Sequence, residues 1–171
     1  GGLGEGFSAF LNPSTQSQVF KIALSIEKDY YAHQTLMIRS FFRQFKQGEA
    51  PPEYYEYLNN NISLENLFNK YPRQAKKAMD EAWRAELGEH QQATPNKIVD
   101  KKIKNALKGK KDWLLIGGPP CQAYSVAGRV RRKEKILDAA KDERVDLYKQ
   151  YLRILAIHNP AVFVMENVKG L

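Results

Sequence analysis

The chain has 171 residues, and its 27 lysines and arginines exceed its 19 aspartates and glutamates, which gives a formal net charge of +8. This length is sufficient for one domain with a real core, and the charge fits a nucleic-acid partner as well as a merely basic soluble protein. The single cysteine excludes an intrachain disulfide, the isolated histidines predict no metal site, and no apolar run approaches the ~20 residues that span a bilayer. We therefore expect a soluble, intracellular protein.

The start of the chain combines a glycine run with a predicted strand. Residues 1–6 have the sequence GGLGEG, which predicts a turn that lets backbone approach a ligand closely, although a flexible terminus has the same composition. Residues 19–26 then predict a strand that ends at Glu27. An acidic residue about 20 positions after a glycine turn, at a strand tip, is placed to accept hydrogen bonds from the ribose hydroxyls of a nucleoside cofactor.

Residues 31–109 are predicted to be mostly helical. One helix is expected from Pro72 to Gly88, with one apolar face buried and one charged face towards water. The buried face is expected to consist of Ala75, Ala78, Met79, Ala82 and Leu87. The charged face is expected to consist of Lys76, Lys77, Asp80 and Glu81. A second helix is expected after Thr94, a predicted N-cap, with a stripe that includes Ile98 and Val99. The tyrosines of residues 51–57 indicate a platform for bases or, more simply, the cover of a small helical core.

The most informative part of the sequence is the segment 113–125, in which an apolar run is followed by a turn and the single cysteine. Residues 113–116 are four apolar residues in a row, which predicts a short strand buried on both faces, as in a parallel sheet. Two glycines and two prolines follow, so the chain must leave the strand by a stiff turn, with Cys121 at its tip. Open α/β sheets hold ligands and reactive groups at such loops. A lone buried thiol with a structural role would fit the same residues.

The rest of the chain predicts a second strand beside the first. Residues 126–142 are rich in arginine and lysine and predict an exposed basic loop. A helix opens at residues 142–143 and ends at residues 159–160, with a predicted buried face formed by Val145, Tyr148, Leu152, Leu155 and Ala156. Residues 161–165 then form a second buried strand. This βαβ unit, with the usual right-handed crossover, brings Glu166 to the same sheet edge as Cys121.

Three segments together resemble the cytosine-5 DNA methyltransferases. Residues 118–122 (GPPCQ) with Ser125 are similar to the family's catalytic-cysteine motif, residues 166–168 (ENV) resemble its second catalytic motif, and residues 1–7 resemble the downstream half of its cofactor loop. Order and rough spacing agree with the family. The resemblance implies an α/β, Rossmann-like methyltransferase fold, a mostly parallel sheet flanked by helices. Residues 1–171 would be part of one catalytic domain, with residues 31–109 as a helical insertion and 126–142 as a mobile basic catalytic loop.

The resemblance also implies S-adenosyl-L-methionine as cofactor and assigns the residues that hold it. These are Gly1, Gly2, Leu3, Glu27, Lys28 and Pro120, with Glu27 on the ribose and Lys28 beside the adenine. Family members usually carry an apolar residue where Lys28 stands. The family's aspartate that bonds the adenine amino group is not recognisable here; the nearest acidic residue, Asp100, falls in a predicted helix and is left unassigned.

For catalysis the resemblance implies that Cys121 adds to carbon 6 of a cytosine flipped out of double-stranded DNA, while Glu166 acts on ring nitrogen 3 and Asn167 supports the loop around it. The nucleic acid would be contacted by Gln122, Ser125, Arg129, Arg131 and Arg132. Alternatives are methylation of transfer RNA and a non-catalytic remnant that only binds nucleic acid. We expect a cytoplasmic protein, nucleoid-associated in a bacterium, with no metal and no membrane contact.

Several parts of the family pattern are not found in the sequence. These are the first strand before the glycine loop, the later arginine motif and the target-recognition region that selects the base sequence. We therefore expect a truncated chain, an incomplete fragment that binds cofactor weakly and methylates inefficiently by itself.

Overall fold

The computed structural model describes residues 2–118 and 143–166. The chain divides into two compact units, the first drawn from residues 1–20 and 87–171 and the second formed by residues 21–86. Each unit contains one small parallel sheet of two described strands. Mixed α/β structure with parallel pairing is therefore confirmed, while the full sheet of a Rossmann-like fold remains a prediction.

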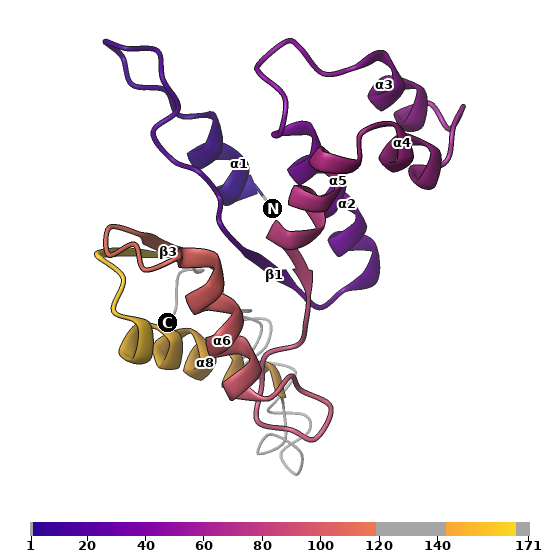
Figure 1. Cartoon of the computed structure of the whole chain (residues 1–171). Helices are drawn as coiled ribbons and strands as arrows, with labels where there is room; N and C mark the ends of the chain where they lie inside the picture. Colours follow the sequence, from indigo (N-terminus) through magenta and orange to yellow (C-terminus); the bar gives the residue numbers. More distant parts are fainter. Residues whose placement is uncertain (1, 119–142, 167–171) are drawn as a thin grey trace, which may run out of the picture. The chain divides into compact units, whose positions relative to one another are not determined.

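The second unit places four helices between two parallel strands. Strand β1 (Ser25–Glu27) pairs with β2 (Ala82–Arg84), and Glu27 lies opposite Arg84. Between them the chain forms α2 (Tyr30–Phe42), α3 (Pro52–Leu58), α4 (Leu64–Lys70) and α5 (Pro72–Glu81) (Figure 1). The side chains of Asp29 and Ser63 cap α2 and α4 by accepting hydrogen bonds from the free backbone N–H groups of the first turns.

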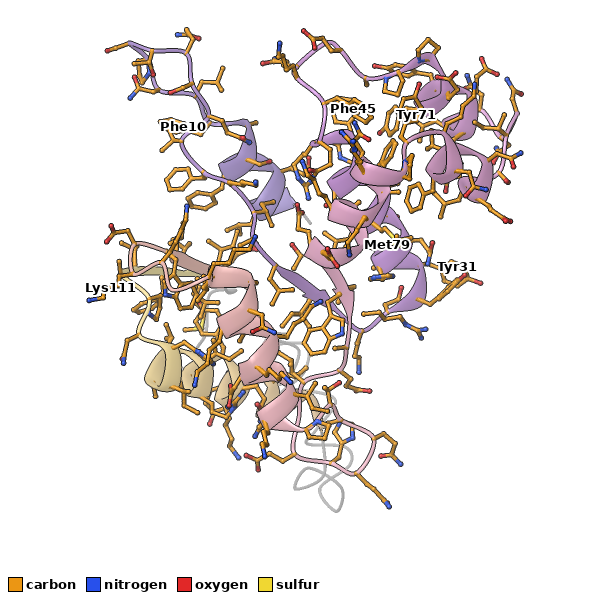
Figure 2. All side chains as sticks on the ribbon, in the orientation of Figure 1. Phe10, Tyr31, Phe45, Tyr71, Met79 and Lys111 are labelled. Atoms are coloured by element: carbon orange, nitrogen blue, oxygen red, sulfur yellow. The ribbon has the colours of Figure 1, made fainter. Side chains whose placement is uncertain are left out.

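An aromatic core holds these helices together. Phe41 and Leu67 are fully buried, and the ring of Phe41 stacks on Phe68 with centroids 5.2 Å apart. Figure 2 labels Phe45 and Tyr71 in the same cluster, where their rings meet edge to face at 5.7 Å. Tyr54 is buried against this core, which supports the simpler interpretation of the tyrosines in residues 51–57.

Four predictions for this part of the chain were wrong. The strand expected over residues 19–26 is confined to residues 25–27, and the helix expected to reach Gly88 ends at Glu81 because the chain turns into β2. Glu81, expected towards water, is buried, and its Oε1 pairs with Nη2 of Arg43 at 2.6 Å. Met79, expected in the core, is half-exposed (Figure 2). Pairing with β1 therefore overrides the helical pattern.

The first unit contains three helices and two strands among the described residues. They are α1 (Gly2–Ala9), α6 (Asn96–Leu107), β3 (Leu114–Gly117), α8 (Glu143–His158) and β4 (Val162–Met165). Strands β3 and β4 pair in parallel, with Leu114 opposite Val162 and Gly117 opposite Met165. This confirms the predicted strand–helix–strand unit. Helix α6 precedes it in the chain and lies beside α8 (Figure 1).

Several local expectations for the first unit are corrected. The glycine run forms helix α1 instead of a turn, and α6 begins after Pro95 without a side-chain cap from Thr94. Ile98 is 52% exposed instead of lying on the buried stripe. The buried face of α8 is rotated from the predicted one: Tyr151 and Ile154 are buried, whereas Leu152 and Ala156 are exposed.

The two strands are also less buried than predicted. The residues of β3 are partly exposed, and on β4 the side chains of Val162 and Phe163 are 57% and 53% exposed. The physical reason is that each strand has one strand neighbour within the described part of the chain, so its other edge is not covered there.

Candidate active site

The carboxyl ends of β3 and β4 position Glu166, the proposed catalytic carboxyl. The backbone N–H of Glu166 donates to the carbonyl oxygen of Gly117 at 2.9 Å, which extends the parallel ladder by one residue beyond β4. A Cβ on Gly118 would lie 3.3 Å from Oε2 of Glu166, so the carboxylate rests against this glycine. The side chain of Glu166 is exposed.

The proposed nucleophile lies outside the described residues, as do several of its neighbours. Cys121 follows Gly118 by three positions, so the chain enters the undescribed segment 119–142 directly beside Glu166. The other predicted site residues outside the description are Gly1, Pro120, Gln122, Ser125, Arg129, Arg131, Arg132 and Asn167, together with the predicted basic loop 126–142. Their predicted roles stay predictions.

The predicted cofactor residues that are described belong to both units. Gly2 and Leu3 lie in the first turn of α1, and the space around Gly2 is open, because a Cβ built there meets no atom within 4 Å. Glu27 ends β1, and its Oε1 accepts a hydrogen bond from the N–H of Asp29 at 2.9 Å. Lys28 is directed to Glu86, with Nζ 2.9 Å from Oε1.

Asp100, which the sequence left unassigned, joins helices α6 and α8. Its carboxylate accepts two hydrogen bonds from Nη1 of Arg153, at 3.0 and 3.1 Å, and Oδ1 lies 2.9 Å from Nε2 of His158. Partial burial raises the pKa of Asp100, but the hydrogen bonds from His158 and Arg153 outweigh it, so that the pKa is lowered overall. Asp100 therefore has a structural role, because it links α6 to Arg153 and His158 of α8.

Replacing Asp100 with asparagine is expected to reduce the free energy of unfolding by about 1–3 kcal/mol at pH 7, because the charge-assisted bonds to α8 are lost. A carboxyl whose pKa is lower in the folded protein contributes its full stabilisation at any pH above its pKa in the unfolded chain, which is near 4. This stabilisation is lost as the pH falls through the pKa in the folded protein. The difference between wild type and Asp100→Asn in urea unfolding should thus shrink as the pH falls below the unfolded pKa, near 4. Asp112→Asn, at an exposed position of the same unit, is the control and should change the free energy by less than about 0.5 kcal/mol. A difference independent of pH would contradict the assignment.

In residues 2–118 and 143–166 there is no group of three or more histidine, cysteine, aspartate or glutamate side chains that could hold a metal ion. Among the described helices, none has the length and apolar character needed to cross a membrane. Gly6, Phe7, Phe10 and Phe20 line an apolar hollow in the first unit.

Sequence reasoning missed Tyr151, which lies beneath the β3–β4 edge. It is buried, and its hydroxyl is within hydrogen-bonding distance of carbonyl oxygens on both strands. The apolar pattern of α8 signalled a buried face but not its rotation, so this residue was not singled out.

Comparisons with known proteins identify the family of this chain. The family model for C-5 cytosine-specific DNA methylases matches residues 66–171. The type II methyltransferase M.Bpa9945I of Bacillus paralicheniformis is 34% identical over 184 aligned positions, covering 100% of this chain and 39% of the relative. M1.HphI of Haemophilus parahaemolyticus and M.FnuDI of Fusobacterium nucleatum, both type II methyltransferases, are 34% and 39% identical over 53% and 44% of the chain.

The chain spans only part of these relatives, namely 39%, 24% and 20% of their lengths. The comparison with solved structures found no significant match. The family model nevertheless covers well over half of the chain and includes both the β3–β4 unit and the residues of the two predicted catalytic motifs. The chain therefore belongs to the C-5 cytosine-specific DNA methylases.

Proposed function

We propose that this protein transfers a methyl group from S-adenosyl-L-methionine to carbon 5 of a cytosine in double-stranded DNA. The observation that carries the proposal is the placement of Glu166 against Gly118, beside the point where the chain continues towards Cys121. Family membership supports the reaction class, and the type II methyltransferase relatives favour DNA over transfer RNA as the substrate.

The proposed chemistry starts at Cys121. Its thiolate adds to carbon 6 of the cytosine, the ring double bond opens, and electron density moves to nitrogen 3. Glu166 stabilises this charge by donating a proton or hydrogen bond to nitrogen 3, and carbon 5 becomes a nucleophilic enamine carbon. Carbon 5 then takes the methyl group, with S-adenosyl-L-homocysteine as the other product. A base removes the proton on carbon 5, nitrogen 3 returns its proton to Glu166, the double bond reforms, and the Cys121 thiolate leaves. Because carbon 6 is not accessible in a stacked duplex, the cytosine must first be flipped out.

The exposure of Glu166 fits this sequence of steps. A carboxyl at an open sheet edge can be reached by a flipped base, and the base itself would then cover it from water. Asn167 is proposed to support the loop that carries Glu166. Gln122, Ser125, Arg129, Arg131 and Arg132 are proposed to contact the nucleic acid, where the arginines neutralise phosphate charge.

The described cofactor residues fit a nucleoside partner. When bound, S-adenosyl-L-methionine supplies an electrophilic methyl group. Glu27 offers a carboxylate at the end of a parallel strand, anchored by the N–H of Asp29, which suits a ribose diol. Lys28 is engaged with Glu86 and gives this position a polar character where family members have an apolar one. Gly1, Gly2, Leu3 and Pro120 are proposed as further residues that contact the cofactor.

The substrate class is tested by methyl incorporation. With radiolabelled S-adenosyl-L-methionine, the protein as encoded in its genome is expected to label duplex DNA and not transfer RNA. Labelling of transfer RNA alone would replace the DNA assignment, and nucleic-acid binding without labelling of either would favour a non-catalytic remnant. Action on chromosomal DNA would place the protein at the bacterial nucleoid.

A further inference from the structure

Tyr151 connects helix α8 to both strands of the first unit. The side chain is 8% exposed, and its hydroxyl lies 3.0 Å from the carbonyl oxygen of Val164 on β4 and 3.3 Å from that of Leu115 on β3. The hydroxyl has one proton, which it donates to these two acceptors in a shared or alternating bond. A buried hydroxyl is costly without such partners, so the two strands hold the ring in place.

The ring of Tyr151 also packs against the backbone that carries Glu166. A Cβ on Gly117 would lie 3.0 Å from Cε2 and 3.3 Å from Cδ2 of Tyr151, closer than ordinary van der Waals contact. The absence of a side chain at Gly117 is therefore what lets the ring approach. The carbonyl of the same Gly117 accepts the hydrogen bond from the N–H of Glu166.

These contacts lie immediately before the functional edge on both strands. Val164 precedes Glu166 by two residues, and Leu115 precedes Gly118 by three. The side chain of Tyr151 thus contacts both β3 and β4 close to their carboxyl ends. A phenylalanine would fill the same space, so the hydroxyl is the part of the residue that links the two strands.

We propose that Tyr151 is a positioning residue, whose hydroxyl fixes the ends of β3 and β4 relative to each other and thereby places the Glu166 carboxyl. The effect on local geometry stands on the contacts described above. The effect on catalysis rests on the proposed function of Glu166. Burial raises the pKa of Tyr151, which keeps the hydroxyl protonated and able to donate at neutral pH.

The test is Tyr151→Phe, with two measurements. Hydrogen exchange at the Glu166 amide, measured by NMR, is expected to rise about fivefold, because the loss of one hydrogen bond eases local opening of the strand ends. The kcat for methyl transfer is expected to fall about 10-fold to 100-fold with little change in KM, since a displaced carboxyl affects the transition state more than binding. Gly117→Ala should act in the same direction by displacing the ring.

Tyr71→Phe is the matched control. It also removes a hydroxyl bond, to Oε2 of Glu53 at 2.8 Å, but in the second unit, so exchange at Glu166 and kcat should remain at their wild-type values. Unchanged exchange at Glu166 in a folded Tyr151→Phe protein would overturn the positioning role. Faster exchange with unchanged kcat would overturn its catalytic consequence. Absence of methyl transfer in the wild type would instead count against the proposed function, and the exchange measurement would still test the geometry.

Discussion

Replacing Cys121 with serine is expected to abolish methyl transfer, with a loss of about 10³-fold or more. A hydroxyl is a far weaker nucleophile than a thiolate at neutral pH, so carbon 6 of the cytosine would not be attacked and carbon 5 would not become reactive. The measurement is the rate of methyl incorporation from S-adenosyl-L-methionine into duplex DNA.

The covalent step can be observed directly with DNA that contains 5-fluorocytosine. The fluorine cannot leave carbon 5 as a proton does, so the adduct is trapped and survives denaturation. Wild-type protein should form this adduct and Cys121→Ser should not, while both retain the same circular dichroism spectrum. Peptide mapping should place the bond on the peptide that contains Cys121, the one cysteine of these 171 residues. Substantial turnover by the serine variant would refute the role of Cys121.

Replacing Glu166 with glutamine is expected to lower kcat by about 10²-fold to 10⁴-fold. Glutamine has nearly the same shape and can still form hydrogen bonds, but it cannot transfer a proton to nitrogen 3 of the cytosine. Single-turnover methylation kinetics would measure the chemical step, and affinity for DNA should change little.

Glu65→Gln is the matched control for this variant. Glu65 lies in the first turn of α4 and is exposed, so the same loss of charge should leave kcat unchanged. If Glu166→Gln and Glu65→Gln had equal activity, the carboxyl at the β3–β4 edge would have no part in the chemistry.

The strands around the site were predictable because their sequence signals are local and strong. Four apolar residues before Gly117 predicted β3 to within one residue, and the Asn159–Pro160 stop set the boundary between α8 and β4. Strand β2 could not be predicted, because the three residues Ala82–Arg84 continue the amphipathic pattern of α5. Only their pairing with β1, more than 50 residues earlier in the chain, makes them a strand.

Of the candidate site, the backbone position of Glu166 was predictable, but the side chains that support it were not. Parallel pairing of β3 and β4 was enough to predict that Glu166 would lie at the end of β3. The supporting residues were not predictable, since Tyr151 contacts Leu115 and Asp100 contacts Arg153 across long stretches of sequence. Both depend on the rotation of α8 about its axis, which the apolar pattern left undetermined.

The hydrogen bond from the Glu166 amide to Gly117 has a consequence for the choice of amino acid at this position. Because this bond continues the ladder past the last residue of β4, the backbone N–H of Glu166 is tied to β3. The length of the side chain then sets how far the carboxyl reaches beyond the sheet. Aspartate, one methylene shorter, would place its acidic group about one carbon–carbon bond length further from the proposed base.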